Sequence, residues 1–302
     1  MSSADRVGAA DRAVAAGGAV AAEGASAADG AGAGGASAAD IAQLAGTCIA
    51  AAEAGAAVLR DLFDKPRAIE HKSRIDLVTD ADRASVGRIL EVLRERAPGV
   101  RVLAEESGAH AGSGEVRFIV DPLDGTTNYA HGIPLYACTV AAEIGGRAVA
   151  GCTIDPSRGE IFHAARGAGA FVRSASGERR LSVAAAATFD DAVVCTGFPY
   201  DKREQLAQLL RWFAAFTERA QGTRRLGSAA IDLAWVAAGR LDGFWEQGLK
   251  PWDVAAGQVL VEEARGVVTR FDGAALLLAG GEIVAANPVL HRGMLALLTS
   301  VR

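Results

Sequence analysis

The chain has 302 residues, of which 50% are hydrophobic and 22% are charged. This balance is that of a globular protein and excludes wholesale disorder, a collagen-like chain and a bare coiled coil. The 36 acidic residues outnumber the 31 Lys and Arg and give a formal charge of −5, so the sequence lacks the basic surplus of a general nucleic-acid binder.

Residues 1–39 are rich in Ala and Gly and contain no Leu, Ile, Phe, Trp or Tyr. Such a segment cannot bury enough apolar surface to offset the entropy of ordering, so we expect a disordered extension. Asp5, Asp11 and Glu23 interrupt it, which argues against a secretory signal. The four cysteines form no C-x-x-C pair, and no later segment approaches about 18 consecutive apolar residues. These features predict a cytoplasmic protein with reduced thiols and no membrane span.

Helices and strands are expected to alternate from residue 40 to the end of the chain. Apolar residues at helical spacing predict the helices, and short apolar runs between turn signals predict the strands. The predicted helices are 40–62, 79–93, 202–220, 228–238, 253–264 and 290–298. The predicted strands are 116–120, 136–144, 148–154, 160–164, 170–173, 192–196, 243–246, 267–271 and 283–286. This order predicts a layered, mixed α/β fold of two subdomains, 40–185 and 186–302.

One acidic motif follows the predicted buried strand 116–120. Asp121 and Asp124 leave this strand end together, and two carboxylates with an intervening carbonyl can hold a hard divalent cation. The amides of Gly125 and Thr126 would face a phosphate if a helix begins there. The same residue types also form ordinary turns, so this motif alone leaves both interpretations open.

Further acidic segments are ambiguous when each is considered alone. Adjacent Glu105 and Glu106 could form a solvated face of the protein. Asp82, in Thr79-x-x-Asp82, and Asp253 could each serve only to cap a helix. The segment 227–230 permits a close backbone approach at a helix start, either for packing or for a ligand.

Taken together, five motifs in this order resemble the inositol monophosphatase family. They are K-S-x-x-D-L-V-T-x-x-D (Lys72–Asp82), A-E-E-S (Ala104–Ser107), D-P-L-D-G-T-T-N-Y (Asp121–Tyr129), G-S-A-A (Gly227–Ala230) and W-D-V-A-A-G (Trp252–Gly257). The resemblance covers residues 40–300. It implies an αβαβα sandwich of the inositol monophosphatase and fructose-1,6-bisphosphatase type, a homodimer, and magnesium-dependent hydrolysis of a phosphate monoester.

The resemblance also implies a role for each motif residue. The ligands of two or three Mg²⁺ ions would be Glu105, Asp121, the carbonyl of Leu123, Asp124 and Asp253. The catalytic residues would be Asp82 and Thr126, which activate the attacking water, and Glu105, which supports a third, weaker metal site. The substrate would contact Asp124, Gly125, Thr126, Ala229, Glu246 and Asp253.

The residues after the motif threonine bear on the substrate. Thr127-Asn128-Tyr129 resembles inositol monophosphatases, whereas relatives that act on adenosine bisphosphates or histidinol phosphate tend to carry a basic residue at position 127. We therefore expect inositol 1-phosphate as substrate. The family resemblance also implies sensitivity to lithium. A different activity within the superfamily, on fructose 1,6-bisphosphate or histidinol phosphate, is the alternative.

A regulatory binding protein that kept the fold but lost the chemistry is a third possibility. Its partner, by analogy with bacterial relatives, would be the transcription machinery. A degenerate site should lack at least one metal ligand, whereas all four acidic ligands are present in this sequence. The sequence therefore favours an enzyme.

Overall fold

The computed structural model describes residues 36–65, 69–71, 77–199, 203–276, 278 and 281–301. Residues 1–35 of the expected extension and the motif segment 72–76 lie outside this described part. The described helices are α1 (Ala38–Leu62), α2 (Asp80–Arg96), α3 (Thr126–Ala130), α4 (Leu206–Arg219), α5 (Ala229–Ala237), α6 (Pro251–Glu263) and α7 (Pro288–Ser300), with a 3-10 turn at Phe189–Asp191.

The larger of two mixed sheets has eight strands in the order β10-β9-β8-β7-β6-β5-β3-β4. Its β3–β5 pair is parallel, and its other pairs are antiparallel. Its strands are β3 (Arg101–Ala104), β4 (Gly108–His110), β5 (Val116–Asp124), β6 (Ala137–Ile144), β7 (Arg147–Asp155), β8 (Glu160–Ala165), β9 (Gly169–Ser174) and β10 (Gly177–Arg180).

The smaller sheet has five strands in the order β12-β11-β13-β15-β14, and β11 is parallel to both β12 and β13. Its strands are β11 (Val193–Thr196), β12 (Gly222–Arg224), β13 (Gly243–Gln247), β14 (Val267–Thr269) and β15 (Glu282–Ala286). A separate antiparallel pair joins β1 (Ile69–His71) to β2 (Leu77–Thr79) just before α2.

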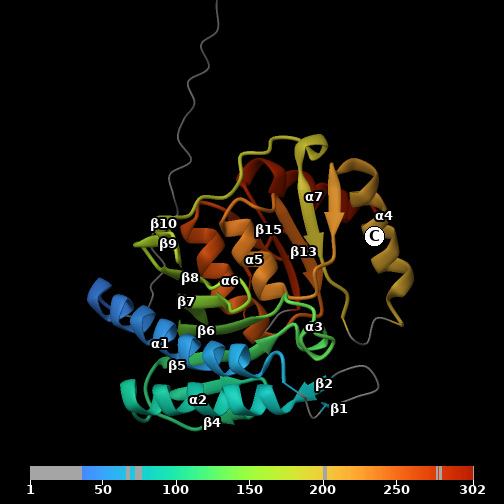
Figure 1. Ribbon diagram of the computed structural model, residues 1–302. Helices are drawn as coiled ribbons and strands as arrows, with labels where there is room; N and C mark the ends of the chain where they lie inside the picture. Colours follow the sequence, from blue (N-terminus) through green and yellow to red (C-terminus); the bar gives the residue numbers. More distant parts are fainter. Residues whose placement is uncertain are drawn as a thin grey trace, which may run out of the picture. The chain divides into compact units, whose positions relative to one another are not determined.

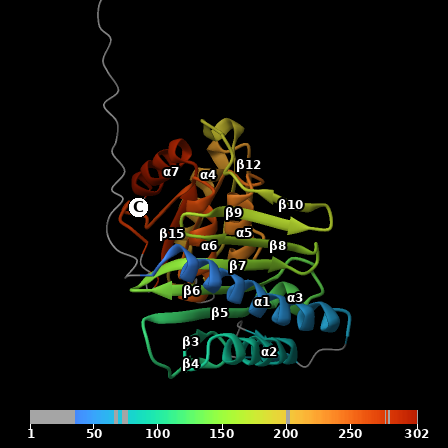
Figure 2. The same ribbon diagram turned by 90° about the vertical axis from the view of Figure 1, so that its left-hand side faces the viewer.

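Helices and sheets alternate in five layers (Figures 1 and 2). Helices α1 and α2 pack together on one face of the larger sheet, and α5 and α6 lie on its other face. Helices α5 and α6 also contact the smaller sheet. Phe244 on β13 packs toward them, while its neighbour Trp245 packs with α4 and α7 on the far side. This αβαβα sandwich confirms the predicted fold class.

Helix α1 begins at Ala38, two residues before the predicted start. The Ser37 side chain accepts a hydrogen bond from the Asp40 amide, and the Asp40 carboxylate accepts one from the Ser37 amide at 2.9 Å. By length and composition α1 could cross a membrane, but its buried face packs against α2, β6 and β7. We therefore interpret α1 as a core helix of the fold.

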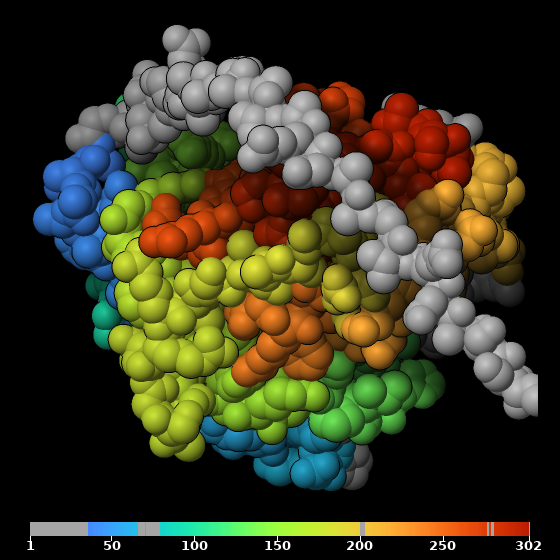
Figure 3. All heavy atoms as spheres, turned by 90° about the horizontal axis from the view of Figure 1, so that it is seen from above, coloured from blue at the N-terminus to red at the C-terminus, as the bar shows by residue number. Residues whose placement is uncertain are grey.

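The structure corrects several predicted elements. Six strands of three or four residues, β1, β2, β3, β4, β10 and β12, are not predicted, because such short segments carry little apolar alternation. All four residues of the edge strand β10 are exposed; this end of the larger sheet, coloured yellow-green, forms one side of the face seen in Figure 3.

The predicted helix 253–264 starts at Pro251 instead, because proline suits the first turn of a helix. The predicted helix 202–220 is described over Leu206–Arg219, and residues 200–202 lie outside the described part. The predicted strand 267–271 ends at Thr269.

Candidate active site

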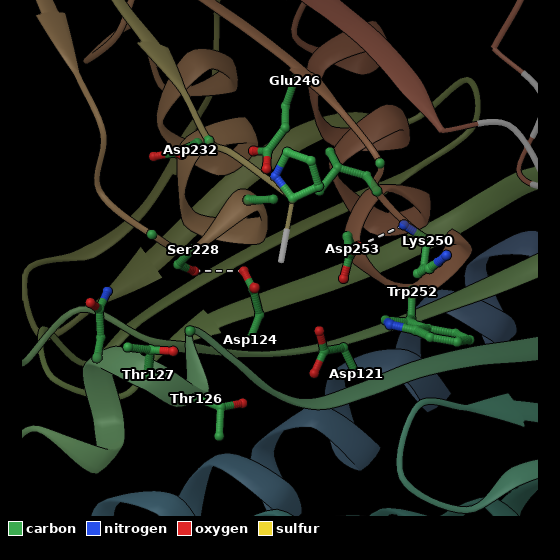
Figure 4. A pocket seen from close by; sticks show the side chains of 18 of the residues that line it. Asp121, Asp124, Thr126, Thr127, Ser228, Asp232, Glu246, Lys250, Trp252 and Asp253 are labelled. Carbon is green, nitrogen blue, oxygen red and sulfur yellow. Dashed lines mark hydrogen bonds between the residues drawn. The ribbon is translucent and has the colours of Figure 1, made fainter. Parts of the chain in front are cut away.

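Segments from both sheets line one cavity of about 650 Å³ (Figure 4). The larger sheet contributes the end of β5 and the start of α3. The smaller sheet and its neighbouring helices contribute residues 197–199, the start of α5, the end of β13 and the start of α6. This volume lies within the range of small-molecule sites, about 300–1,000 Å³.

Four carboxylates converge on this cavity, and we call them the acidic cluster: Glu105, Asp121, Asp124 and Asp253. One oxygen from each of the three aspartates lies within 4.8 Å of the other two. Figure 4 shows these three side chains turned toward one another across the cavity. Glu105, which follows β3, lines the same cavity. The structure therefore brings together the four acids that the sequence analysis placed in three distant segments.

The end of strand β5 holds Asp121. The Leu123 amide donates a hydrogen bond to Asp121 Oδ1 at 3.0 Å, and the pairing with β6 becomes irregular between Asp121 and Asp124. The Ser85 hydroxyl of α2 donates a hydrogen bond to the Pro122 carbonyl at 3.0 Å and so ties this strand end to α2. The irregular strand end turns two nearby carboxylates toward one space.

Helix α5 holds Asp124. Ser228 Oγ donates to Asp124 Oδ2 at 2.6 Å, and the Ala230 amide donates to the same oxygen at 2.7 Å. Gly125 follows with φ of 88°, and a Cβ at this position would lie 3.1 Å from the Leu135 carbonyl oxygen. A glycine is therefore required where the chain turns from β5 into α3.

Asp253 is the third residue of α6. Its Oδ2 accepts a hydrogen bond from the Lys250 amide at 2.6 Å, so the residue does cap the helix, as its sequence position permits. Its carboxylate also faces Asp121 and Asp124. The Asp253 side chain therefore both caps α6 and belongs to the acidic cluster.

The electrostatics of the acidic cluster favour a cation. Burial raises the pKa of Asp121 well above its ordinary value, and the charges of Glu105, Asp124 and Asp253 raise it further. Burial, and then the charge of Asp124, likewise raise the pKa of Asp253. Four acids this close destabilise one another when ionised. A hard divalent cation with oxygen ligands would remove this repulsion, and the donor set fits such an ion.

Asp82 lies beside the cavity, behind Thr126. Thr126 Oγ1 is 3.3 Å from Asp82 Oδ1 and 3.0 Å from the Leu123 carbonyl oxygen. The other Asp82 oxygen accepts hydrogen bonds from the Thr79 amide at 2.7 Å and the Thr79 hydroxyl at 2.6 Å. Asp82 thus caps α2 with one oxygen and reaches Thr126 with the other.

The far end of the cavity carries a second pair of buried acids. Glu246 is 8% exposed and Asp232 is 1% exposed, and both line the cavity with Ala229. Burial, and then the charge of Asp232, raise the pKa of Glu246. A side chain at Gly197 would overlap both Glu246 carboxylate oxygens, so the backbone of residue 197 lies directly against this carboxylate.

The sequence analysis did not identify Asp232 or Arg225 as site residues. Asp232 is the one acid in the otherwise apolar helix α5, four residues after Ser228, and this contrast was the available signal. Arg225 lines the cavity from the loop before α5 and offers no comparable signal, because arginine is common in exposed loops.

An αβαβα sandwich with carboxylates converging at the junction of its sheets is the arrangement of a phosphatase of the layered α/β class. The profile of the Inositol monophosphatase family matches residues 40–302 of the chain. The chain belongs to this family.

Individual relatives agree with this assignment. An inositol-1-monophosphatase of Mesorhizobium japonicum is 43% identical over 248 residues, which cover 82% of this chain and 92% of that protein. The Nus factor SuhB of Escherichia coli is 39% identical over 250 residues, with the same two coverages. The structure of an inositol monophosphatase from Anabaena shares 37% identity and a TM-score of 0.78, covering 87% of this chain and 98% of that one.

Proposed function

We propose that the protein is a magnesium-dependent phosphatase that hydrolyses inositol 1-phosphate and similar small polyol phosphates. The observation that carries this proposal is the acidic cluster, whose four carboxylates face one cavity. The inositol-1-monophosphatases among its relatives supply the substrate class. Bound Mg²⁺, two or three ions held by the acidic cluster and the Leu123 carbonyl, would stabilise charge on the phosphate and lower the pKa of bound water.

The residues around the cluster have separate tasks in this proposal. Thr126 takes a proton from the attacking water as its own hydroxyl proton passes to Asp82, along the 3.3 Å contact between them. The amides of Gly125 and Thr126 bind phosphate oxygens. At the far end, Glu246 accepts hydrogen bonds from substrate hydroxyls, with the Ala229 amide beside it. These assignments follow the roles that the sequence resemblance implies.

Ser228 is expected to tune cation affinity through Asp124. Ser228→Ala removes the 2.6 Å hydrogen bond to Asp124 and the side-chain cap of α5. We expect the Mg²⁺ concentration for half-maximal turnover to rise about tenfold, since groups that orient metal ligands affect affinity by about 10–100-fold. A Mg²⁺ titration of phosphate release checks this. Ser228→Thr keeps the hydroxyl and is the control; an equal shift in both variants would contradict the role of the hydrogen bond.

The substrate is tested by phosphate release from a panel at saturating Mg²⁺. The panel contains inositol 1-phosphate, fructose 1,6-bisphosphate, histidinol phosphate and adenosine 3′,5′-bisphosphate. We expect the highest kcat/KM on inositol 1-phosphate, and for Glu246→Gln a KM about tenfold higher with a smaller change in kcat, because a hydrogen bond to a charged group contributes about 1.5–3 kcal/mol. A clear preference for another panel member would replace inositol 1-phosphate as the substrate.

A second, additional role is favoured by the similarity to proteins named Nus factor SuhB. In this role the protein would bind a component of the transcription machinery while keeping its active site. Co-purification of the wild-type chain and of a catalytically inactive variant with RNA polymerase tests it. Equal recovery would show binding independent of turnover, and no recovery with either would refute the role.

Several general properties belong to the same proposal. We propose a cytoplasmic homodimer that does not bind nucleic acid directly and whose turnover is inhibited by lithium. We also propose that residues 40–185 and 186–302 are two subdomains of one catalytic unit, since each range contains one of the two sheets.

A further inference from the structure

Arg225 occupies a distinctive place in the cavity. It lies in the loop between β12 and α5, and with Lys250 it supplies the basic side chains of the described cavity lining. Lys250 precedes α6 beside Asp253, whereas Arg225 precedes the helix that carries Asp232. Arg225 is exposed and takes part in none of the ion pairs formed between described residues.

An aromatic pair holds the Arg225 side chain in position. Its guanidinium carbon lies 5.6 Å from the centre of the Phe198 ring, which also lines the cavity. Phe198 in turn meets Phe213 of α4 edge-on, with ring centres 6.0 Å apart. A guanidinium on an aromatic face keeps its charge and its outward N–H groups available.

The ionised forms of Asp232 and Glu246, at the far end of the cavity, require a compensating positive charge. Asp232 Oδ1 is buried and has no hydrogen-bond partner among the described residues. Burial, and then the charge of Asp232, disfavour the ionised form of Glu246. Phe198, on which Arg225 rests, directly follows Gly197, whose backbone lies against the Glu246 carboxylate. From this seat the positive charge of Arg225 lowers the pKa of both Glu246 and Asp232.

We propose that Arg225 is a positioning residue for substrate binding: seated on Phe198, it provides the positive charge that keeps Glu246 available as a carboxylate acceptor for substrate hydroxyls. Arg225 acts through Glu246, with Asp232 as the second acid of the same wall. This inference rests on the proposed function, because it requires Glu246 to bind substrate hydroxyls. The loop between β12 and α5, which contains none of the metal ligands, would thus contribute to substrate specificity.

The test compares a substrate rich in hydroxyls with one that lacks them. The measured quantity is the kcat/KM for inositol 1-phosphate divided by that for phenyl phosphate, at saturating Mg²⁺. We expect Arg225→Gln to lower this ratio about tenfold, mainly through KM for inositol 1-phosphate. Arg225→Lys, which keeps the charge, should restore most of the ratio. Arg224→Gln removes the same charge one residue away, outside the cavity lining, and is the matched control that should leave the ratio unchanged.

A double-mutant cycle shows whether Arg225 acts through Glu246. In a Glu246→Gln background the substitution Arg225→Gln should lower the ratio by less than about twofold, because residue 246 is then no longer a carboxylate that the positive charge of Arg225 can stabilise. Multiplicative effects of the two substitutions would overturn the proposal. So would an equal loss on both substrates, or a larger loss on fructose 1,6-bisphosphate than on inositol 1-phosphate, which would assign Arg225 to a second phosphate group.

The same data separate this inference from the proposed function. If the wild-type protein releases no phosphate from inositol 1-phosphate, the proposed function fails. If the wild type hydrolyses it and the Arg225→Gln ratio equals that of Arg224→Gln, the positioning role alone fails.

Discussion

Asp121→Asn is expected to lower phosphate release by about a thousandfold or more, the largest effect of any single substitution in the site. Asp121 is 1% exposed, and one of its carboxylate oxygens lies within 4.8 Å of an oxygen of both Asp124 and Asp253. Replacing its charge weakens cation binding where charge develops in the reaction, and each 1.36 kcal/mol lost there is a factor of ten in rate. Release of inorganic phosphate under saturating substrate measures this effect.

The same substitution is expected to change stability in opposite directions with and without cation. In a chelator, Asp121→Asn removes the burial of a charged group and the repulsion, which together raise the pKa of this carboxyl, so its melting temperature should exceed that of the wild type by a few degrees. With Mg²⁺ at 100 times its Kd, binding stabilises the wild type by about 2.7 kcal/mol, and the variant loses this gain. A variant that melts lower under both conditions would indicate a packing defect instead.

Asp82→Asn is expected to reduce kcat by about 100- to 1,000-fold with little change in KM. The amide cannot accept a proton through Thr126, and positioned bases contribute about 10²- to 10⁴-fold. Asparagine has the shape of aspartate and can still cap α2, so the free energy of unfolding should fall by only about 1 kcal/mol. Steady-state kinetics and urea unfolding measure the two effects.

Thr79→Val is the control that separates capping from catalysis at this position. It removes the hydroxyl that caps α2 and contacts Asp82, but keeps the Asp82 carboxylate and the Thr79 amide. We expect a stability loss of about 1 kcal/mol and a loss of turnover below about tenfold. If both variants lose stability and turnover in the same proportion, Asp82 is only a cap.

The layered fold was predictable because the long elements carry clear periodic patterns. The predicted strands 116–120, 136–144 and 148–154 are confirmed as β5, β6 and β7. The six short strands were not predictable, since partner strands rather than local pattern decide their pairing. The start of α1 at Ala38 was missed because alanines without larger apolar residues resemble the segment before them.

Much of the site was also predictable, since its acids stand at the ends of predicted elements within recognisable motifs. The sequence could not show which residues of distant segments hold these side chains in place. Ser228 anchors Asp124 across 104 positions of the chain, and Arg225 rests on Phe198. Such contacts depend on how α5 packs between the two sheets, which no local pattern encodes.

The most direct test of the acidic cluster as a cation site for hydrolysis is phosphate release from inositol 1-phosphate as Mg²⁺ is titrated into chelator-treated wild-type protein. We predict no turnover above background without Mg²⁺, full turnover on its addition, and no restoration for Asp121→Asn at the same concentrations. Undiminished turnover in the chelator, or restoration of Asp121→Asn to wild-type rates, would contradict the role assigned to the four carboxylates.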